Sequence, residues 1–210
     1  MEIIQIPVAP IGANCYIVSE GKEAFIIDPG GDAGKIIRAA KNFGVRYILL
    51  THTHFDHIGG LNDVKNAFPE AKTAVHNLEK EWLYSAGLNF SEDFGFSFIY
   101  EKEIDIELKD GMKLDFAGTE INVLHTPGHT PGSTCFYIKK SETCGSPVLF
   151  SGDTLFRHSI GRTDFPGGSG RKIIESIKNK LLVLPDNTVV YPGHDETTSI
   201  ALEKKLNPFL

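Results

Sequence analysis

A short run of histidines and one aspartate is the part of this sequence best suited to chemistry. Residues 51–60 read THTHFDHIGG and follow an apolar run. Imidazole and carboxylate groups are typical zinc ligands in catalytic sites, which keep one position open for water or substrate. In extended backbone, side chains two residues apart point to the same side, so His52, His54 and Asp56 can converge. His57 then points to the other side, and ligands that face two ways suit two adjacent metal ions.

Further candidate ligands follow three other strand-like segments, since one cluster cannot fill two coordination spheres. These segments run into LHTPGHTPGS, FSGDTLF and VYPGHD. They supply Asp153, His194 and two histidines four residues apart, His125 and His129, either of which could be a ligand. Polar ligands that recur just after apolar strands predict a metal site.

Short strands separated by helices must position these residues. Strands are expected where Val, Ile, Phe and Tyr concentrate between Gly, Pro and Asp. The expected strands are 2–6, 15–19, 24–28, 47–51, 72–76, 121–125, 134–139, 148–151 and 188–191. Apolar residues at helical spacing predict helices over 33–42, 60–68, 77–86, 171–182 and 196–206. The early strands follow one another closely and helices separate the others, so a mixed sheet packed with helices is expected.

The composition excludes some classes of partner. The 210 residues include 21 Lys and Arg against 27 Asp and Glu, which gives a net charge of −6. This balance argues against nucleic acid or an anionic membrane as a partner, and no apolar run reaches the roughly 18 residues of a membrane span. The start of the chain has no signal-peptide pattern. Three cysteines without a CxxC pair fit a reducing compartment, so we expect a cytoplasmic location.

The motifs HxHxDH, TPGHT, SGDTLF and YPGH, in this order and over nearly the whole chain, resemble the metallo-β-lactamase superfamily. The resemblance implies an α+β fold, the αββα sandwich of two mixed β-sheets flanked by helices, formed as a single domain by residues 1–210. It also implies two Zn²⁺ ions per chain, with Fe or Mn possible in either site. The resemblance implies that His52, His54 and His129 hold the first metal, that Asp56, His57 and His194 hold the second, and that Asp153 is a ligand of both. It thus selects His129, and His125 is interpreted as a structural histidine at a strand end.

Within that superfamily, the chain is similar to short bacterial hydrolases of the glyoxalase II type. Residues 153–156 and the stretch SIGRTDFPGG at 159–168 carry this similarity. It implies a zinc-dependent thioesterase that cleaves S-2-hydroxyacylglutathione thioesters, such as S-lactoylglutathione, with a metal-bridging hydroxide. The expected partner is thus a small-molecule thioester, and Arg162 would bind a substrate carboxylate. Longer glyoxalase II enzymes add a C-terminal helical glutathione-binding domain, which we expect this chain to lack because it ends soon after His194.

Asp56 has two expected roles that do not exclude each other. It can ligate the second metal, and it can act as a catalytic residue that orients or deprotonates the attacking water. Metal activation alone accounts for a hydroxide near neutral pH, so the ligand role ranks first.

Several other polar residues are expected to be structural. Asp28 is interpreted as a turn residue that bonds local backbone, and Asp164 as a partner of Arg162 or of backbone. His76 and His158 are left out of the site. The cysteines are expected to be small buried hydrophobes.

Three other functions fit parts of the sequence. A persulfide dioxygenase of the same fold would hold one Fe²⁺ on His52, His129 and Asp153, a facial arrangement suited to O₂, and it shares a segment like 161–165. A nuclease of the superfamily shares HxHxDH, but the charge of −6 without a basic arm disfavours it. A non-catalytic metal-binding or scaffold protein has no need of the complete ligand set.

The segment 87–103 is rich in aromatic residues, namely Phe90, Phe94, Phe96, Phe98 and Tyr100. It is either a loop whose aromatics fold back onto the core, or a cap over a substrate cleft, or a subunit contact. The sequence specifies neither the oligomeric state nor the acyl group, thiol and metal that the protein uses.

Overall fold

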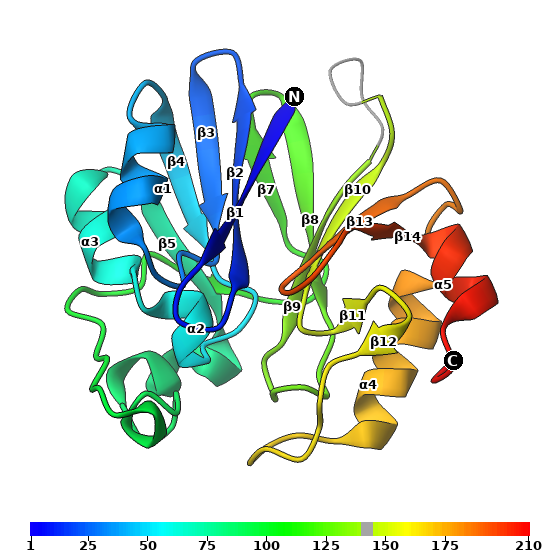
Figure 1. The fold of residues 1–210 in the computed structure, drawn as a ribbon. Helices are drawn as coiled ribbons and strands as arrows, with labels where there is room; N and C mark the ends of the chain where they lie inside the picture. The colour runs from blue at the N-terminus through cyan, green and yellow to red at the C-terminus, as the bar shows by residue number, and fades with distance from the viewer. Residues whose placement is uncertain (140–144) are drawn as a thin grey trace. The chain divides into compact units, whose positions relative to one another are not determined.

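The computed structural model describes residues 1–139 and 145–210, which form two compact units, Met1–Leu108 and Lys109–Leu210. Each unit contains a six-stranded sheet with its own helices (Figure 1). Among the described residues, no helix has the length and apolar composition needed to cross a bilayer. Cys144 lies outside the described residues. The single-domain organisation of residues 1–210 stays a prediction.

The first unit has the strand order β1-β2-β3-β4-β5-β6. Its strands are β1 (Glu2–Val8), β2 (Ala13–Glu20), β3 (Glu23–Ile27), β4 (Gly44–Leu49), β5 (Lys72–His76) and β6 (Ile106–Leu108). Its helices are α1 (Ala33–Ala40), α2 (Phe55–Ile58), α3 (Leu61–Ala67) and the 3-10 helices η1 (Asn77–Tyr84) and η2 (Glu92–Phe94). The first three strands pair antiparallel, whereas β3 to β6 pair parallel.

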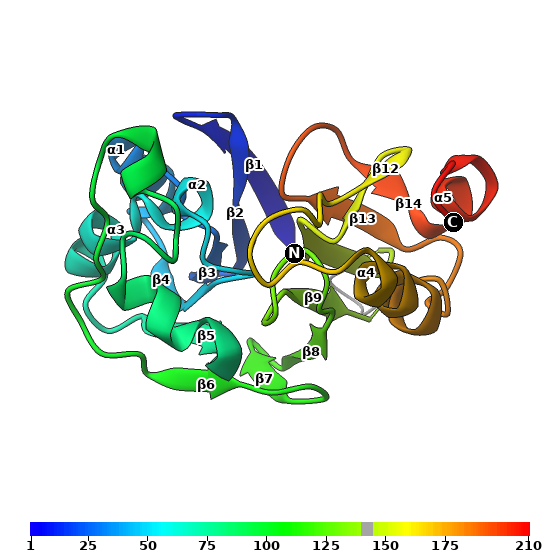
Figure 2. The ribbon, with the colours of Figure 1, turned by 90° about the horizontal axis from the view of Figure 1, so that it is seen from below.

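Helices α1 and α3 cover one side of this sheet, as Figures 1 and 2 show. Ile36 of α1 and Val64 of α3 are fully buried and share a core with Ile17, Ile26 and Ile48 of the strands. Removing these side chains from water is the main force that holds the helices on the sheet. Polar loops connect the ends of these strands and helices.

Those loops gather where the parallel strands end. Asp28 follows β3, and its backbone N–H donates to the Leu49 carbonyl at the end of β4, at 3.1 Å. The Leu50 N–H in turn donates to the Ala74 carbonyl of β5, at 3.0 Å. The carboxyl ends of parallel neighbours meet at one sheet edge, which is where open α/β sheets bind ligands. Asp28 and the HxHxDH segment therefore share that edge.

The second unit has the order β14-β13-β10-β9-β8-β7 and a separate β11-β12 hairpin. Its strands are β7 (Lys113–Phe116), β8 (Thr119–His125), β9 (Thr134–Ile138), β10 (Val148–Gly152), β11 (Leu155–Phe156), β12 (Ser159–Ile160), β13 (Val189–Pro192) and β14 (Thr198–Ser199). Its helices are α4 (Gly170–Ser176), the π-helical turn η3 (Ile177–Leu181) and α5 (Ile200–Leu206). Ile173, Ile177 and Ile200 of these helices are buried with Leu149 and Val190 of the strands.

Strand direction explains where the ligands of this unit lie. Strand β8 is antiparallel to β9, and β9 is antiparallel to β10, so β8 and β10 run the same way. Strand β13 is parallel to β10. The carboxyl ends of β8, β10 and β13 therefore lie at one edge, and the segments with His129, Asp153 and His194 follow them.

The expected strands lie within or overlap observed ones, but several short strands were missed. These are β6, β7, β11, β12 and β14, which have two to four residues and show little periodicity. The helix expected over 77–86 is the 3-10 helix η1, and the one expected over 171–182 continues from α4 into a π-helical turn. The helix expected over 196–206 begins at Ile200, where the Ser199 hydroxyl accepts from the Leu202 N–H and caps it.

Candidate metal centre

The HxHxDH segment joins β4 to α2 and places four buried side chains together. We call these the N-terminal ligand group: His52, His54, Asp56 and His57. The ring centroid of His52 lies 4.8 Å from that of His54 and 4.1 Å from that of His57. Asp56 Oδ2 lies 3.5 Å from His57 Nε2. The four ligand candidates of this segment are thus brought together, with Asp56 and His57 positioned by α2 rather than by extended backbone.

The threonines between the histidines anchor the segment to two buried carboxylates. The Thr51 N–H donates to Asp28 Oδ1 at 2.8 Å. The Thr53 N–H and hydroxyl both donate to Glu79 Oε2, at 3.1 and 2.7 Å. Neighbouring side chains in extended backbone point to opposite sides. Anchoring the threonines on one side therefore directs His52 and His54 to the other.

Asp28 also sets which ring nitrogen carries the hydrogen in two of the histidines. Its Oδ2 accepts from the Thr51 hydroxyl at 2.6 Å and lies 2.9 Å from His57 Nδ1. A carboxylate only accepts, so His57 Nδ1 donates. The Thr51 hydroxyl has given its hydrogen to Asp28, so it accepts from His52 Nδ1 at 3.1 Å. Each neutral ring then keeps its lone pair on Nε2, where a metal can bind.

This arrangement corrects the interpretation of Asp28 as a residue that bonds only local backbone. Potential ligand atoms of Asp28, His52 and His57 lie within 4.8 Å of one another, close enough to suggest a metal cluster of their own. The hydrogen bonds above instead identify Asp28 as the group that orients the two histidines. The sequence reading missed this because the contact depends on β3 and β4 being parallel neighbours.

Two glycines allow backbone to approach the ligand-bearing segments. A Cβ at Gly30 would lie 1.6 Å from the Asp56 carbonyl oxygen, in the first unit. A Cβ at Gly161 would lie 1.8 Å from the Asp153 carbonyl oxygen and 3.4 Å from His129 Cβ, in the second. Heavy atoms cannot approach so closely, so only glycine fits at both positions.

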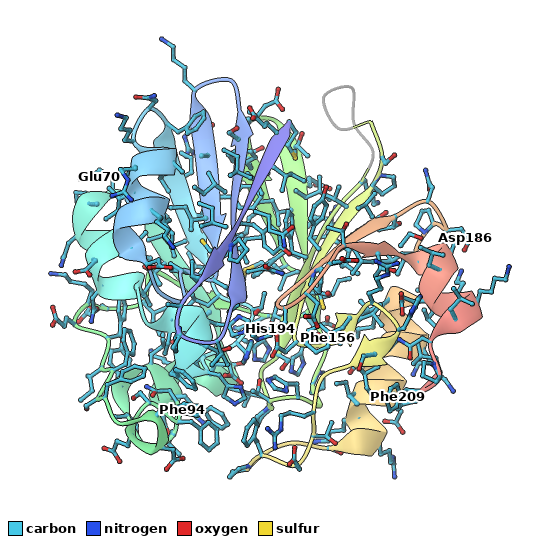
Figure 3. All side chains as sticks on the ribbon, viewed as in Figure 1. Glu70, Phe94, Phe156, Asp186, His194 and Phe209 are labelled. Carbon is cyan, nitrogen blue, oxygen red and sulfur yellow. The ribbon has the colours of Figure 1, made fainter. Side chains whose placement is uncertain are left out.

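The second unit brings together the C-terminal ligand group, which we define as His129, Asp153 and His194. Gly152 of β10 is the register partner of Pro192, and the Gly193 N–H donates to the Gly152 carbonyl at 2.8 Å. Asp153 Oδ2 consequently lies 3.7 Å from His194 Nε2, and it lies 3.5 Å from His129 Nε2. Phe156 lies beside His194, and Figure 3 labels both; their ring centroids are 6.1 Å apart at an interplanar angle of 80°.

The main chain of Arg162 orients His129. His129 Nδ1 lies 2.8 Å from the Arg162 carbonyl oxygen, which can only accept. Nδ1 therefore carries the hydrogen, and Nε2, which faces Asp153, keeps the lone pair. This contact was also missed, because a backbone acceptor leaves no signature in the residue type.

The guanidinium of Arg162 makes a separate, exposed ion pair. Its Nε and Nη2 donate to the two carboxylate oxygens of Asp164, at 2.7 and 2.6 Å, as one of the two partners expected for Asp164. These hydrogen bonds lower the pKa of Asp164 to about 2 and raise the pKa of Arg162. The guanidinium also lies 4.0 Å from the ring centroid of Phe165.

Two other histidines make local hydrogen bonds outside the two ligand groups. His125 Nε2 lies 2.9 Å from the Pro131 carbonyl oxygen, and the His125 carbonyl accepts from Lys180 Nζ at 2.7 Å. His76 Nδ1 accepts from the Leu78 N–H at 3.3 Å and caps η1. Both side chains are thus engaged away from the ligand positions.

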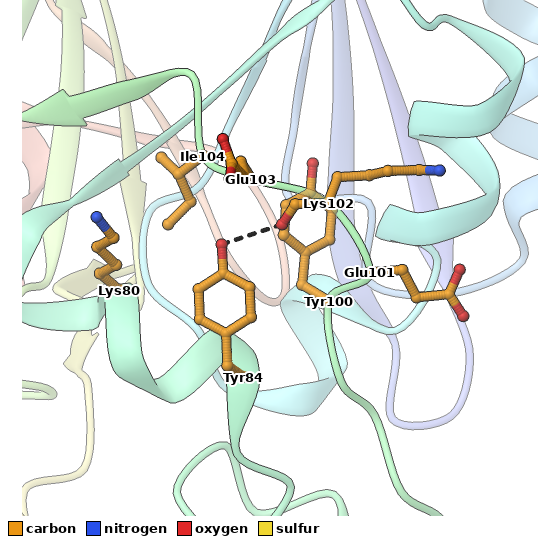
Figure 4. Close-up of a pocket in the computed structure, with 7 residues that line it drawn as sticks. All are labelled: Lys80, Tyr84, Tyr100, Glu101, Lys102, Glu103 and Ile104. Atoms are coloured by element: carbon orange, nitrogen blue, oxygen red, sulfur yellow. Dashed lines mark hydrogen bonds between the residues drawn. The ribbon is translucent and has the colours of Figure 1, made fainter.

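A cavity of about 570 Å³ in the first unit contains no member of the N-terminal ligand group. Figure 4 shows its lining: Lys80, Tyr84, Tyr100, Glu101, Lys102, Glu103 and Ile104. The Tyr84 hydroxyl donates to the Lys102 carbonyl at 3.0 Å. The lining combines lysine with glutamate side chains, and the Tyr84 hydroxyl is already hydrogen-bonded, so this cavity is not a candidate metal site.

The donor chemistry fits a metal centre. Imidazole nitrogens and carboxylate oxygens suit zinc, iron and manganese, and for His52, His57 and His129 the partner of Nδ1 leaves Nε2 available. A family model described as "Metallo-beta-lactamase superfamily" matches residues 8–194. The chain belongs to this superfamily. The expected resemblance is confirmed.

Relatives of this superfamily member match it over almost its whole length. "Probable metallo-hydrolase YqgX" of Bacillus subtilis is 38% identical over 98% of this chain and 96% of its own. "Hydroxyacylglutathione hydrolase GloC" of Haemophilus influenzae is 35% identical over 100% and 98%. These names and the two ligand groups make the chain a metal-dependent hydrolase of the superfamily.

Solved structures confirm the fold class. The crystal structure of BLEG-1 B3 metallo-beta-lactamase has a TM-score of 0.93 and 42% identity, and the match covers 100% of this chain and 99% of that one. The structure of TTHA1623 in a di-iron-bound form has a TM-score of 0.84 and 34% identity, over 99% and 100%. The predicted metallo-β-lactamase fold, with two mixed sheets and their helices, is therefore correct. The His and Asp clusters are consistent with a dinuclear centre.

Proposed function

We propose that this hydrolase cleaves thioesters of the S-2-hydroxyacylglutathione type, with S-lactoylglutathione as the reference substrate. The observation that carries the proposal is the hydrogen bonding of the candidate ligands. Asp28 and the Arg162 carbonyl hold three histidines in the tautomer that a metal needs. The name of the GloC relative supports the thioester class.

In this proposal, the chain would hold two Zn²⁺ ions, with Fe or Mn as substitutes. His52, His54 and His129 would hold the first ion, and Asp56, His57 and His194 would hold the second. Asp153 would be a ligand of both. Bound metals would lower the pKa of water toward neutrality and polarise the scissile carbonyl. Asp56, buried at the start of α2, would orient the attacking water and accept its proton.

The first test combines metal content with activity. Protein as isolated should carry about two metal ions per chain and cleave S-lactoylglutathione, and chelation should abolish cleavage until Zn²⁺, Fe²⁺ or Mn²⁺ is restored. Glutathione persulfide is assayed in parallel. One iron per chain, with oxygen uptake and sulfite formation from the persulfide, would overturn the thioesterase proposal in favour of a dioxygenase.

The BLEG-1 match favours β-lactam hydrolysis as a second candidate, since that protein is 42% identical and is described as a B3 metallo-beta-lactamase. The same metal-activated water would attack a β-lactam carbonyl. A cephalosporin assayed beside S-lactoylglutathione separates the two activities. A kcat/KM for the cephalosporin above that for the thioester would reverse their order.

Arg162 is proposed to bind a carboxylate of the thiol carrier. Changing Arg162 to Ala should raise KM about tenfold for S-lactoylglutathione and leave a thioester with a neutral thiol unchanged, because a charge-assisted hydrogen bond is lost. With its pKa near 2, Asp164 stays ionised and paired at any assay pH above about 4, so the effect should not vary from pH 6 to 9. Arg162→Lys, which keeps the charge without the two-pronged geometry, is the control. Equal effects on both thioesters would contradict the role.

The proposal also includes a small-molecule partner, no nucleic-acid or membrane role, and a cytoplasmic location. Two thiols support a reducing compartment, since Cys15 and Cys135 are buried and unbridged. Burial raises the pKa of Cys135 to about 11 and holds the pKa of Cys15 well above its ordinary value. Both behave as small buried hydrophobes, as expected.

A further inference from the structure

We propose that Trp82 and Phe90 form an aromatic wall beside His54 that binds an apolar group on the acyl part of the substrate. The preferred substrate would then be an aromatic 2-hydroxyacyl thioester rather than the lactoyl one. This inference rests on the proposed function, because it assigns the acyl group of the same thioester.

The two rings of the wall and the ring of His54 lie close together within the first unit. The Phe90 centroid lies 5.1 Å from that of His54, at an interplanar angle of 67°. The Trp82 centroid lies 6.1 Å from that of His54, at 30°, and 6.3 Å from that of Phe90, at 84°. These separations are typical of interacting aromatic rings. Trp82 and Phe90 are half-buried, so each also has exposed apolar surface.

Phe90 has an unfavourable backbone conformation that its neighbours maintain. Its φ is +64°, a left-handed conformation that is rare and costly for a bulky residue. The fully buried Asn89 and Ser91 on either side hold it there. Asn89 Nδ2 donates to the Trp82 and Phe98 carbonyls at 3.0 and 3.1 Å, and Asn89 Oδ1 accepts from the Ser91 N–H at 3.0 Å. Such strain persists only where the surroundings determine it, and it concentrates at functional sites.

The same loop is bonded to the ligand-bearing helix. The Asn89 carbonyl accepts from the N–H of Phe55, the first residue of α2, at 2.9 Å. Phe94 and Phe96 pack on Phe55, with centroids 4.1 and 5.5 Å from its centroid, and they are 53% and 40% exposed. Figure 3 labels Phe94. Within the aromatic segment, Phe90 contacts the candidate ligand His54, whereas Phe94 contacts Phe55. Phe94 therefore offers a matched control in the same loop.

The apolar character of the wall selects the acyl side of the thioester. Glutathione carries two carboxylates, an ammonium group and two amides, which lose hydration on an uncharged aromatic surface. An aromatic substituent on the acyl group instead leaves water and gains ring contacts. S-mandeloylglutathione and S-lactoylglutathione are the matched probes, because they share the thiol and differ by phenyl in place of methyl.

The test measures kcat/KM for both probes with the metal-loaded protein. Wild type should prefer the mandeloyl thioester by about tenfold or more, the usual scale for apolar group recognition. Phe90→Asn removes the ring, and asparagine tolerates the left-handed backbone. This variant should lose the preference through the KM for the mandeloyl thioester and keep its metal content. Phe94→Asn should keep the preference.

A binding measurement makes the test independent of turnover. Trp82 is the only tryptophan in the chain, so its emission reports on the wall alone. Mandelate should change this emission in wild type and Phe94→Asn but not in Phe90→Asn, and lactate should change it in none of them. Absence of thioester cleavage, with the mandelate response intact, would overturn the proposed function but keep an aromatic-acid site. Cleavage with no acyl preference, or an equal loss on both probes in Phe90→Asn, would overturn the wall.

Discussion

Changing Asp153 to Asn should lower kcat/KM for S-lactoylglutathione by at least about a thousandfold, or about 4 kcal/mol of transition-state stabilisation. Asp153 Oδ2 lies 3.5 and 3.7 Å from the Nε2 atoms of His129 and His194, so this carboxylate is central to the C-terminal ligand group. An amide is neutral and a weaker ligand than a carboxylate. Metal content by elemental analysis should fall below the wild-type value in parallel.

The matched control for this prediction is Asp186→Asn, which makes the same chemical change in the same unit. Asp186 is 70% exposed and pairs with Lys204 at 2.6 Å, away from the ligand group. It should keep wild-type metal content and activity, since exposed ion pairs contribute little. If the Asp153 variant turned over the thioester at the wild-type rate, Asp153 would not be a metal ligand.

The candidate ligands could be grouped from the sequence because each follows a strand. Asp153 and His194 are adjacent because β10 and β13 are parallel and in register at Gly152 and Pro192. Residue type and position after an apolar run are both visible in the sequence, and parallel strands bring such positions to one edge. The fold class was predicted from the same motifs, through the resemblance they carry.

The groups that orient the ligands could not be predicted in this way. Asp28 and Glu79 act on Thr51 and Thr53 from positions 23 and 26 residues away in the chain. The acceptor for His129 is a backbone carbonyl, which every residue has. Short strands were missed for a similar reason, because tertiary contacts, not local periodicity, maintain them.

Changing Asp28 to Asn should weaken Zn²⁺ binding about 10- to 100-fold, the usual effect of losing a group that orients a metal ligand. The Asn oxygen would accept from the Thr51 N–H, as Asp28 Oδ1 does at 2.8 Å. The amide NH₂ would then replace Oδ2 and donate to the Thr51 hydroxyl and to His57 Nδ1. The hydroxyl would turn its own hydrogen toward His52 Nδ1. Both rings would have to move their hydrogen to Nε2, the atom that a metal needs.

The opposite orientation of the Asn amide is also unfavourable. It would place the amide NH₂ against the Thr51 N–H, so that two buried donors would face each other. Competition with a chelator measures the affinity, and ¹⁵N NMR of the metal-free protein reports the tautomers. Glu79→Gln is the control, since both bonds from Thr53 go to Oε2 and a Gln oxygen can accept them there. It should bind Zn²⁺ within about threefold of wild type. Wild-type affinity in the Asp28 variant, with hydrogen still on Nδ1, would show that Asp28 does not control the ligand tautomers.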